Sequence, residues 1–185
     1  MKIVAGKNRG NKLKSIKGLL IRPTSHKVRE ALFDIIGTSI QGAYFLDLFS
    51  GTGAIGIEAL SRGADKVIFV EKELKAIKII KENLEITKNN SNAIVYKIDF
   101  LYGLKILAKN GYLFDYIFLD PPYNMNLVNI SLVEILKLPI LNKNGIIIAQ
   151  HHKREEVNTN LVNLKLIKQK KYGECNLSLF NCTNL

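Results

Sequence analysis

The feature that most constrains the fold is a regular alternation of short apolar runs with helix-patterned segments from Tyr44 onward. Short apolar runs bounded by turn residues are typical of buried strands, whereas apolar residues three and four apart are typical of amphipathic helices. Such alternation predicts a mostly parallel sheet with helices on both faces. The expected strands are 44–48, 66–71, 93–98, 115–119 and 145–150, and the expected helices are 54–62, 73–88, 101–109 and 127–137.

The last part of the chain departs from this alternation. Segments 162–171 and 175–182 are both β-rich and are joined through Tyr172-Gly173, which leaves no room for a crossover helix. Two strands joined so closely form an antiparallel hairpin. The α/β domain is therefore expected to hold a seven-stranded, mostly parallel sheet with an antiparallel C-terminal hairpin.

The first part of the chain predicts a small extension. Residues 2–17 alternate loosely around the turn Gly6–Gly10, which is typical of a β-hairpin. After Pro23-Thr24-Ser25, apolar residues at helical spacing run from Val28 to Ile36 and stop at Gly37. We expect a basic hairpin extension over 1–20 and one α/β domain over 21–185.

A glycine-rich turn lies between the first expected strand and its helix. Gly51, Gly53 and Gly56 match the Gly-x-Gly-x-x-Gly pattern of nucleotide-binding turns, in which glycines let the backbone approach the ligand. Glu71 ends the next strand, at the position where an acid binds ribose hydroxyls. The turn predicts an adenosine-containing ligand and does not say which one.

Two further acids narrow the choice of ligand. Asp47 lies in the strand just before the glycines, where a carboxylate would repel a pyrophosphate but attract an amino group. Asp99 ends the third strand and could accept from an adenine amino group, although Asp99 or Glu71 could instead cap the following helix. S-adenosylmethionine carries an amine, ribose hydroxyls and adenine but no phosphate, and it is the predicted cofactor.

The stretch Asp120-Pro121-Pro122-Tyr123 follows the apolar run 116–119. Neither proline can donate a ladder hydrogen bond, so the strand ends there with a carboxylate, free carbonyls and a ring at the sheet edge where ligands bind. A carboxylate and a carbonyl can accept both protons of an exocyclic amine while the ring stacks on the base. Taken alone, the motif is equally compatible with a proline-rich turn that ends a strand.

Charge points to a polyanionic partner. The formal net charge is +11, and the first acid, Glu30, comes only after a run of basic residues. An N-terminal segment with only positive charges, followed by a domain of mixed charge, suggests that the partner is a nucleic acid. A basic surface that only keeps the protein soluble is the simpler explanation. The basic residues before Glu30 are Lys2, Lys7, Arg9, Lys12, Lys14, Lys17, Arg22, Lys27 and Arg29.

Several classes of protein are disfavoured. Cys175 and Cys182 fall at odd spacing in one expected strand, so they face opposite sides and cannot bridge each other. No Cys/His ligand spacing exists, so no metal site is expected. No apolar run approaches the ~20 residues of a membrane span, and the first residues lack a signal peptide's apolar core. We expect a cytoplasmic monomer without a membrane partner.

Three stretches together resemble the RsmD family of bacterial methyltransferases, which act on the exocyclic N2 of a guanine in 16S ribosomal RNA. They are the glycine turn with Glu58-Ala-Leu-Ser-Arg-Gly-Ala64 behind it, Asp120–Tyr123, and Arg22-Pro-Thr-Ser-His-Lys-Val-Arg-Glu30. The resemblance covers nearly the whole chain. It implies the Rossmann-like class I S-adenosylmethionine-dependent fold, with 16S rRNA or a small-subunit assembly particle as partner.

The resemblance also implies roles for individual residues. The expected cofactor-binding residues are Asp47, Phe49, Ser50, Gly51, Gly53, Glu71, Asp99 and Phe100, and the target base would be held by Asp120, Pro121, Pro122 and Tyr123. RNA contacts are expected from Lys7, Arg9, Lys12, Lys14, Arg22, Thr24 and Arg29. For Arg22 and Thr24, the family motif is also compatible with a contact to the cofactor. Two positions depart from the family pattern: Asn8 stands where an aromatic residue is usual, and His26 replaces a commonly acidic one.

Three other functions compete with this one. DNA adenine-N6 and related amino-methyltransferases share the Asp-Pro-Pro-Tyr motif, but the short links between elements leave no room for a target-recognition region. A nicotinamide oxidoreductase would share the glycine turn, but Asp47 disfavours a pyrophosphate and 185 residues leave no substrate domain. A non-catalytic RNA-binding module would explain the charge and leave Asp120–Tyr123 without a purpose.

Overall fold

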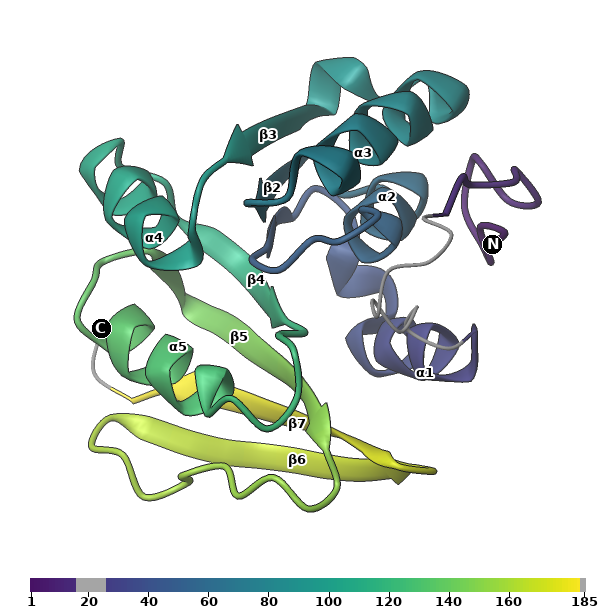
Figure 1. The fold of residues 1–185 in the computed structure, drawn as a ribbon. Coiled ribbons are helices and arrows are strands. Elements are labelled where there is room, and N and C mark those ends of the chain that lie inside the picture. The colour runs from purple at the N-terminus through teal and green to yellow at the C-terminus, as the bar shows by residue number, and fades with distance from the viewer. Residues whose placement is uncertain (16–25, 184–185) are drawn as a thin grey trace.

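The computed structural model describes residues 1–15 and 26–183, and within them one sheet has the strand order β3-β2-β1-β4-β5-β7-β6 (Figure 1). β1 to β5 pair in parallel, whereas β7 is antiparallel to both β5 and β6. This confirms the predicted seven-stranded sheet with its C-terminal hairpin. The strands are β1 Tyr44–Asp47, β2 Lys66–Glu71, β3 Ala93–Lys97, β4 Phe114–Leu119, β5 Leu141–His152, β6 Leu164–Tyr172 and β7 Cys175–Cys182.

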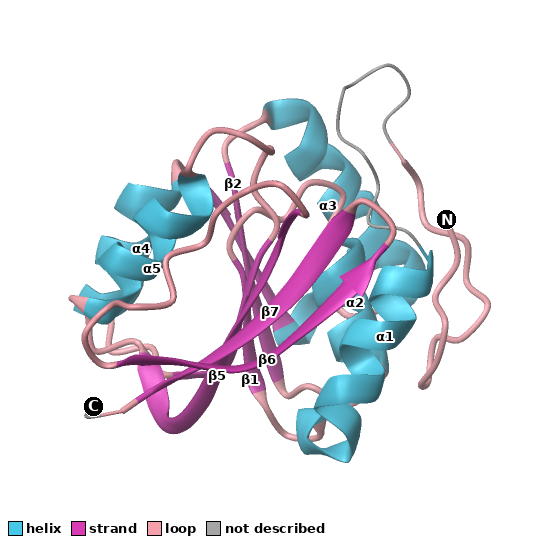
Figure 2. Ribbon diagram, turned by 90° about the horizontal axis from the view of Figure 1, so that it is seen from below, coloured by secondary structure: helices cyan, strands magenta, loops and turns pink. Residues whose placement is uncertain are grey.

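Helices cover both faces of the sheet (Figure 2). One buried cluster joins one sheet face to α1 His26–Ile36, α2 Ala54–Ser61 and α3 Leu74–Thr87, and the other joins the opposite face to α4 Phe100–Lys109 and α5 Leu127–Leu136. Two short 3-10 helices, η1 Gly37–Ile40 and η2 Asn90–Asn92, lie in the connections. Parallel strands buried on both faces explain why their sequences are continuously apolar rather than alternating.

β5 is the element whose length differs most from the prediction. It runs from Leu141 to His152, whereas its apolar run predicted only 145–150. Leu141 pairs with Phe114 of β4 beyond a shift in register, and at the other end His152 pairs with Cys175 of β7. Partner strands therefore extend β5 through polar residues whose own pattern gives no strand signal.

The N-terminal segment is shorter than the predicted hairpin over 2–17. Within residues 1–15, one antiparallel bridge joins Lys2 to Lys12, and the buried side chains of Ile3 and Leu13 attach the segment to the core. Residues 16–20 of the expected extension lie outside the described residues.

Buried polar side chains of α2 and α3 fix this segment to the domain. The backbone N–H groups of Val4 and Ala5 donate to Glu58 Oε2 at 2.9 Å and Oε1 at 3.0 Å. The N–H of Lys14 donates to Asn83 Oδ1 at 2.7 Å. Because a buried carboxylate is costly unless it is hydrogen-bonded, these two N–H groups also stabilise the Glu58 carboxylate.

Cys175 and Cys182 both lie in β7, and no disulfide joins them. Among residues 1–15 and 26–183, no helix combines the length and the apolar character needed to cross a membrane. Over the same residues, no three His, Cys, Asp or Glu side chains gather into a potential metal site.

Candidate active site

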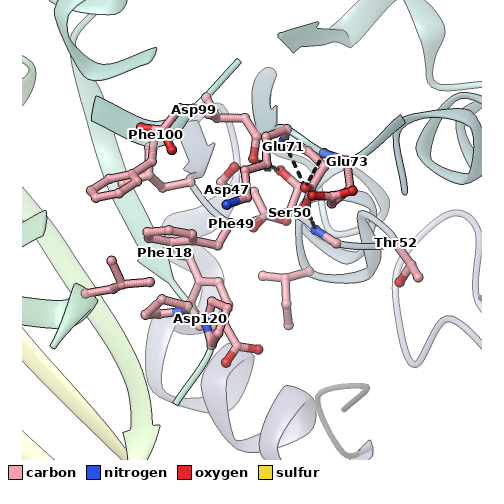
Figure 3. Close-up of a pocket in the computed structure, with 18 of the residues that line it drawn as sticks. Asp47, Phe49, Ser50, Thr52, Glu71, Glu73, Asp99, Phe100, Phe118 and Asp120 are labelled. Atoms are coloured by element: carbon pink, nitrogen blue, oxygen red, sulfur yellow. Dashed lines mark hydrogen bonds between the residues drawn. The ribbon is translucent and has the colours of Figure 1, made fainter. Parts of the chain in front are cut away.

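A cavity of about 470 Å³ opens at the carboxyl ends of β1, β2 and β4 (Figure 3). This volume falls within the range of about 300–1,000 Å³ typical of small-molecule sites. Its lining joins the glycine turn after β1, the acid that ends β2, the start of α4 and the stretch after β4. The predicted residues among the lining are Asp47, Phe49, Ser50, Gly51, Glu71, Asp99, Phe100, Asp120, Pro121, Pro122 and Tyr123.

The glycine turn is held by its own backbone and by β2. Ser50 donates from its N–H to Val70 O at 3.1 Å and from its hydroxyl to Asp47 O at 2.7 Å. Gly53 caps α2 with φ 75°, a left-handed conformation that favours glycine. Gly53 does not itself line the cavity. Its role in the structure is to allow the backbone conformation of the turn.

Glu71 is oriented by backbone donors. Its Oε2 accepts from Gly51 N at 2.8 Å, and its Oε1 accepts from the N–H groups of Lys72 and Glu73 at 2.8 Å and 2.9 Å. The first N–H of the glycine turn therefore already donates to a carboxylate. A phosphate placed there would compete with Glu71 and meet its negative charge.

Asp47 is a buried carboxyl at the base of the cavity. Its side chain is 2% exposed and its Oδ2 accepts from Gly56 N at 3.1 Å. The pKa of Asp47 is raised from 3.8 to about 7, mainly by burial and also by the nearby charges of Asp120 and Glu71, while the Gly56 hydrogen bond opposes the shift. A cationic group in the cavity would favour the ionised form of Asp47.

Aromatic rings form the part of the cavity next to Asp99. The rings of Phe49 and Phe100 lie 4.9 Å apart at 40°, and Phe118 also lines the cavity (Figure 3). Asp99 Oδ1 caps α4 by accepting from Leu101 N at 3.0 Å. The capping role considered from the sequence is therefore present, and Asp99 lines the cavity as well.

The stretch after β4 forms the other end of the cavity in the view of Figure 3, where Asp120 lies away from Asp99 and Glu71. Gln150 Nε2 donates to the Tyr123 hydroxyl at 3.3 Å. The Tyr123 and His152 rings lie 5.8 Å apart at 55°. The end of β5 thus supports the tyrosine of the predicted target-binding motif.

The charge of the lining fits the predicted cofactor. It contains five acids and one lysine, Lys72, in a protein of net charge +11. An acidic pocket in a basic protein suits a cationic ligand and disfavours a pyrophosphate. The buried Asp47 suits a cationic amine, Glu71 a pair of ribose hydroxyls, and the aromatic rings a flat base.

Several residues at the site were not predicted, among them Gln150, His152 and Met125. Gln150 and His152 support Tyr123, and Met125 lines the cavity although its side chain is 60% exposed. A polar run at the end of an apolar strand, Gln150-His151-His152, is the sequence signal that could have drawn attention to the first two.

The predicted RNA-binding residues fall into three groups. Lys7, Arg9, Lys12 and Lys14 are exposed on the N-terminal segment, where Lys14 Nζ also lies 3.0 Å from Glu82 Oε2. Arg22 and Thr24 lie outside the described residues. Arg29 requires a correction.

Arg29 is not available to RNA. Its side chain is 1% exposed, its Nε lies 3.7 Å from Glu58 Oε2, and its guanidinium donates to Lys2 O. Burial is the main cause that lowers its pKa. The prediction of an RNA contact is wrong for this residue, because α1 turns it inward against α2 and the N-terminal segment.

Asn8, which departs from the family pattern, is a structural contact. Its amide donates to Thr87 O at 2.9 Å and its Oδ1 accepts from Asn89 Nδ2 at 3.0 Å. Its backbone N–H donates to Ser61 Oγ at 3.0 Å. The side chain therefore joins the segment to the end of α3 instead of presenting a stacking surface.

Comparison with known proteins agrees with this geometry. The family described as "Conserved hypothetical protein 95" matches residues 1–181. The chain is 38% identical over 133 residues to the Haemophilus influenzae protein named ribosomal RNA small subunit methyltransferase D, covering 71% of this chain and 68% of that protein. The chain therefore belongs to the RsmD family.

Further relatives support the same membership. A Bacillus subtilis protein, YlbH, whose rRNA methyltransferase activity is itself provisional, is 44% identical over 123 residues, 66% of this chain and 67% of that one. A solved structure of a hypothetical protein from Thermus thermophilus superimposes with a TM-score of 0.84 at 31% identity, covering 97% and 98% of the two chains. This RsmD-family chain thus has the predicted fold of an S-adenosylmethionine-dependent methyltransferase.

Proposed function

We propose that this RsmD-family methyltransferase modifies the exocyclic N2 amine of a guanine in small-subunit ribosomal RNA. The observation that carries the proposal is that Asp120–Tyr123 and the glycine turn line one cavity. A cofactor held at the turn and an amine held at Asp120 would then face each other. The names of the relatives add the choice of ribosomal RNA, and the basic N-terminal segment agrees with it.

Different residues of the cavity bind different parts of the cofactor. Asp47 and Glu71 hold the amine and the ribose of the cofactor, and Phe49 and Phe100 hold its base. Bound S-adenosylmethionine supplies an electrophilic methyl group on a sulfonium. Positioning carries most of the rate, because such a methyl group needs little further activation.

On the substrate side, the guanine is unpaired or turned out of its stem at a cost of a few kcal/mol. Stacking on Tyr123 returns about 1–3 kcal/mol. The Asp120 carboxylate and the Pro121 carbonyl each accept a hydrogen bond from one N2–H, so the nitrogen lone pair is drawn out of conjugation with the ring. The N2 amine held at Asp120 would receive the methyl group that S-adenosylmethionine supplies, and the surplus proton of the amine would pass to Asp120 or to water.

The direct test is transfer of a radiolabelled methyl group to 16S rRNA, to the small subunit and to duplex DNA, followed by mass-spectrometric mapping of the product. We expect N2-methylguanine at one position of the RNA. Methylation of DNA alone, or of an adenine, would refute the proposal in favour of a DNA amino-methyltransferase.

The role of Asp120 is tested by Asp120→Ala. We expect turnover to fall by about a hundredfold or more while cofactor affinity changes little, because Asp120 orients the amine and not the cofactor. Asp34→Ala, an exposed acid on α1, is the matched control and should keep full activity. If Asp120→Ala retained more than about a tenth of wild-type turnover, the carboxylate would not have this role.

A further inference from the structure

The C-terminal hairpin presents a basic surface that the proposed function leaves unused. β6 is an edge strand of the sheet (Figure 1). It carries four exposed lysines and no acid. Unlike the basic N-terminal segment, this strand drew no functional prediction from the sequence, where its lysines are interspersed with apolar residues. The four are Lys165, Lys168, Lys170 and Lys171.

A bulge in β6 places three of these lysines on one face. Their partners in β7 are Asn181 for Lys165, Leu179 for Lys168 and Leu177 for Lys170. These partners alternate along β7 and so point to the same side. Without the shift in register between Leu166 and Lys168, the spacing of three would have turned Lys165 and Lys168 to opposite sides.

The same face leads to the Tyr123 side of the cavity. Leu177 pairs with Lys170 on one side and with Gln150 on the other, and Cys175 likewise joins Tyr172 to His152. Cross-strand pairs share a face, so the lysines lie on the side that bears Gln150 and His152. Those two β5 residues contact Tyr123.

Local acids do not neutralise this face. Among the described residues, no ion pair joins Lys165, Lys168 or Lys170 to a carboxylate. The acid of the hairpin turn, Glu174, lies 2.7 Å from Lys153 and 3.7 Å from His152. Lys168 and Lys170, two residues apart on one face, are separated by about 6.8 Å along the strand.

We propose that the face of β6 bearing Lys165, Lys168 and Lys170 binds the phosphate backbone of the RNA whose guanine enters the cavity at Tyr123. The inference rests on the proposed function. The N-terminal segment lies over α2 and α3, whereas β6 lies at the far end of the strand order, so the RNA would be held on two separate sides of the catalytic pocket (Figures 1 and 2).

A second explanation for lysines on an edge strand is protection against edge-to-edge aggregation. The two explanations predict different results. If the lysines only protect the edge, a variant without them should bind RNA with unchanged affinity, whether or not it aggregates. Phosphate binding predicts a soluble variant whose affinity for RNA is lower and less dependent on salt.

The test replaces Lys165, Lys168 and Lys170 together with Gln. Binding of purified 16S rRNA is measured by filter retention from about 50 to 300 mM KCl, and methyl transfer is measured in parallel. The slope of log affinity against log salt should shrink by about 2–3, and affinity near 150 mM salt should fall at least about tenfold. KM for RNA should rise while turnover at saturating RNA stays near wild type.

The matched control removes the same charge elsewhere. Lys105 and Lys109 are exposed on α4, which covers the opposite face of the sheet, and Lys143 is exposed near the start of β5. The triple Gln variant of these three should bind RNA with the wild-type slope. An equal loss in both triple variants would show that only net charge matters and would overturn the assignment.

A wild-type slope in a folded β6 variant would also overturn it. If the triple variant aggregates, Lys170→Gln alone is used, and its slope should shrink by about 1; no change refutes the assignment. If the wild-type protein methylates no RNA, the proposed function fails, while the slopes still decide whether β6 contacts RNA.

Discussion

Replacing Asp47 with Asn tests the electrostatic account of the cofactor pocket. Asn has nearly the same volume, and its Oδ1 can still accept the hydrogen bond from Gly56 N, but it carries no charge. Burial raises the pKa of Asp47 from 3.8 to about 7. The wild-type protein should therefore lose stability over a pH range in which the Asn variant does not.

The sign and size follow from proton linkage. Between about pH 4 and pH 7 the unfolded chain has released the Asp47 proton and the folded protein still holds it, so the free energy of unfolding falls as pH rises. Each pH unit in this window is worth about 1.4 kcal/mol, or about 4 kcal/mol in total. The advantage of Asp47→Asn should grow by about 2–3 kcal/mol from pH 5 to pH 7 and then level off.

The assay is urea unfolding of both proteins without cofactor at pH 5, 6, 7 and 8 at fixed ionic strength. Taking the difference between the two proteins cancels every group that titrates equally in both, including His151, whose pKa burial lowers. A difference that stays constant within about 0.5 kcal/mol from pH 5 to pH 8 would refute the reasoning.

Cofactor affinity should change with pH in the opposite direction to stability. A cationic amine beside Asp47 favours its ionised form, so S-adenosylmethionine affinity should rise by up to about tenfold from pH 6 to pH 7.5. Asp47→Asn should bind more weakly and lose most of this rise. A wild-type affinity that is flat with pH would place the amine away from Asp47.

Two further predictions concern the N-terminal segment. Glu58→Gln leaves the buried Arg29 without its carboxylate and should lower the free energy of unfolding by about 3–5 kcal/mol in urea titrations. Glu82→Gln, the same change in an exposed pair, should cost less than about 1 kcal/mol, and equal costs would contradict the buried anchor. Neutralising the exposed cations of the segment should reduce the salt slope of RNA binding by about 3–4, and an unchanged slope would count against an RNA-binding arm. The substitutions are Lys7, Arg9, Lys12 and Lys14, all to Gln.

The sequence by itself determined the architecture and the chemistry of the pocket. Strand and helix periods, the glycines before α2 and the prolines after β4 are local signals, because each reflects the backbone geometry of a few neighbouring residues. In a parallel sheet the carboxyl ends of the strands share one edge, so the sequence alone predicts that Asp47, Glu71 and Asp120 lie close together. The cavity lining confirms their convergence.

Tertiary structure alone decided which charges are exposed and which strands pair. Arg29 lies in a basic stretch of sequence that is typical of RNA-binding arginines, yet its side chain is buried in contact with Glu58. The extent of β5 and the shared face of Lys165, Lys168 and Lys170 follow from pairing with β4 and β7. Burial and register depend on contacts with residues far away in the chain, so they cannot be predicted from a short stretch of sequence.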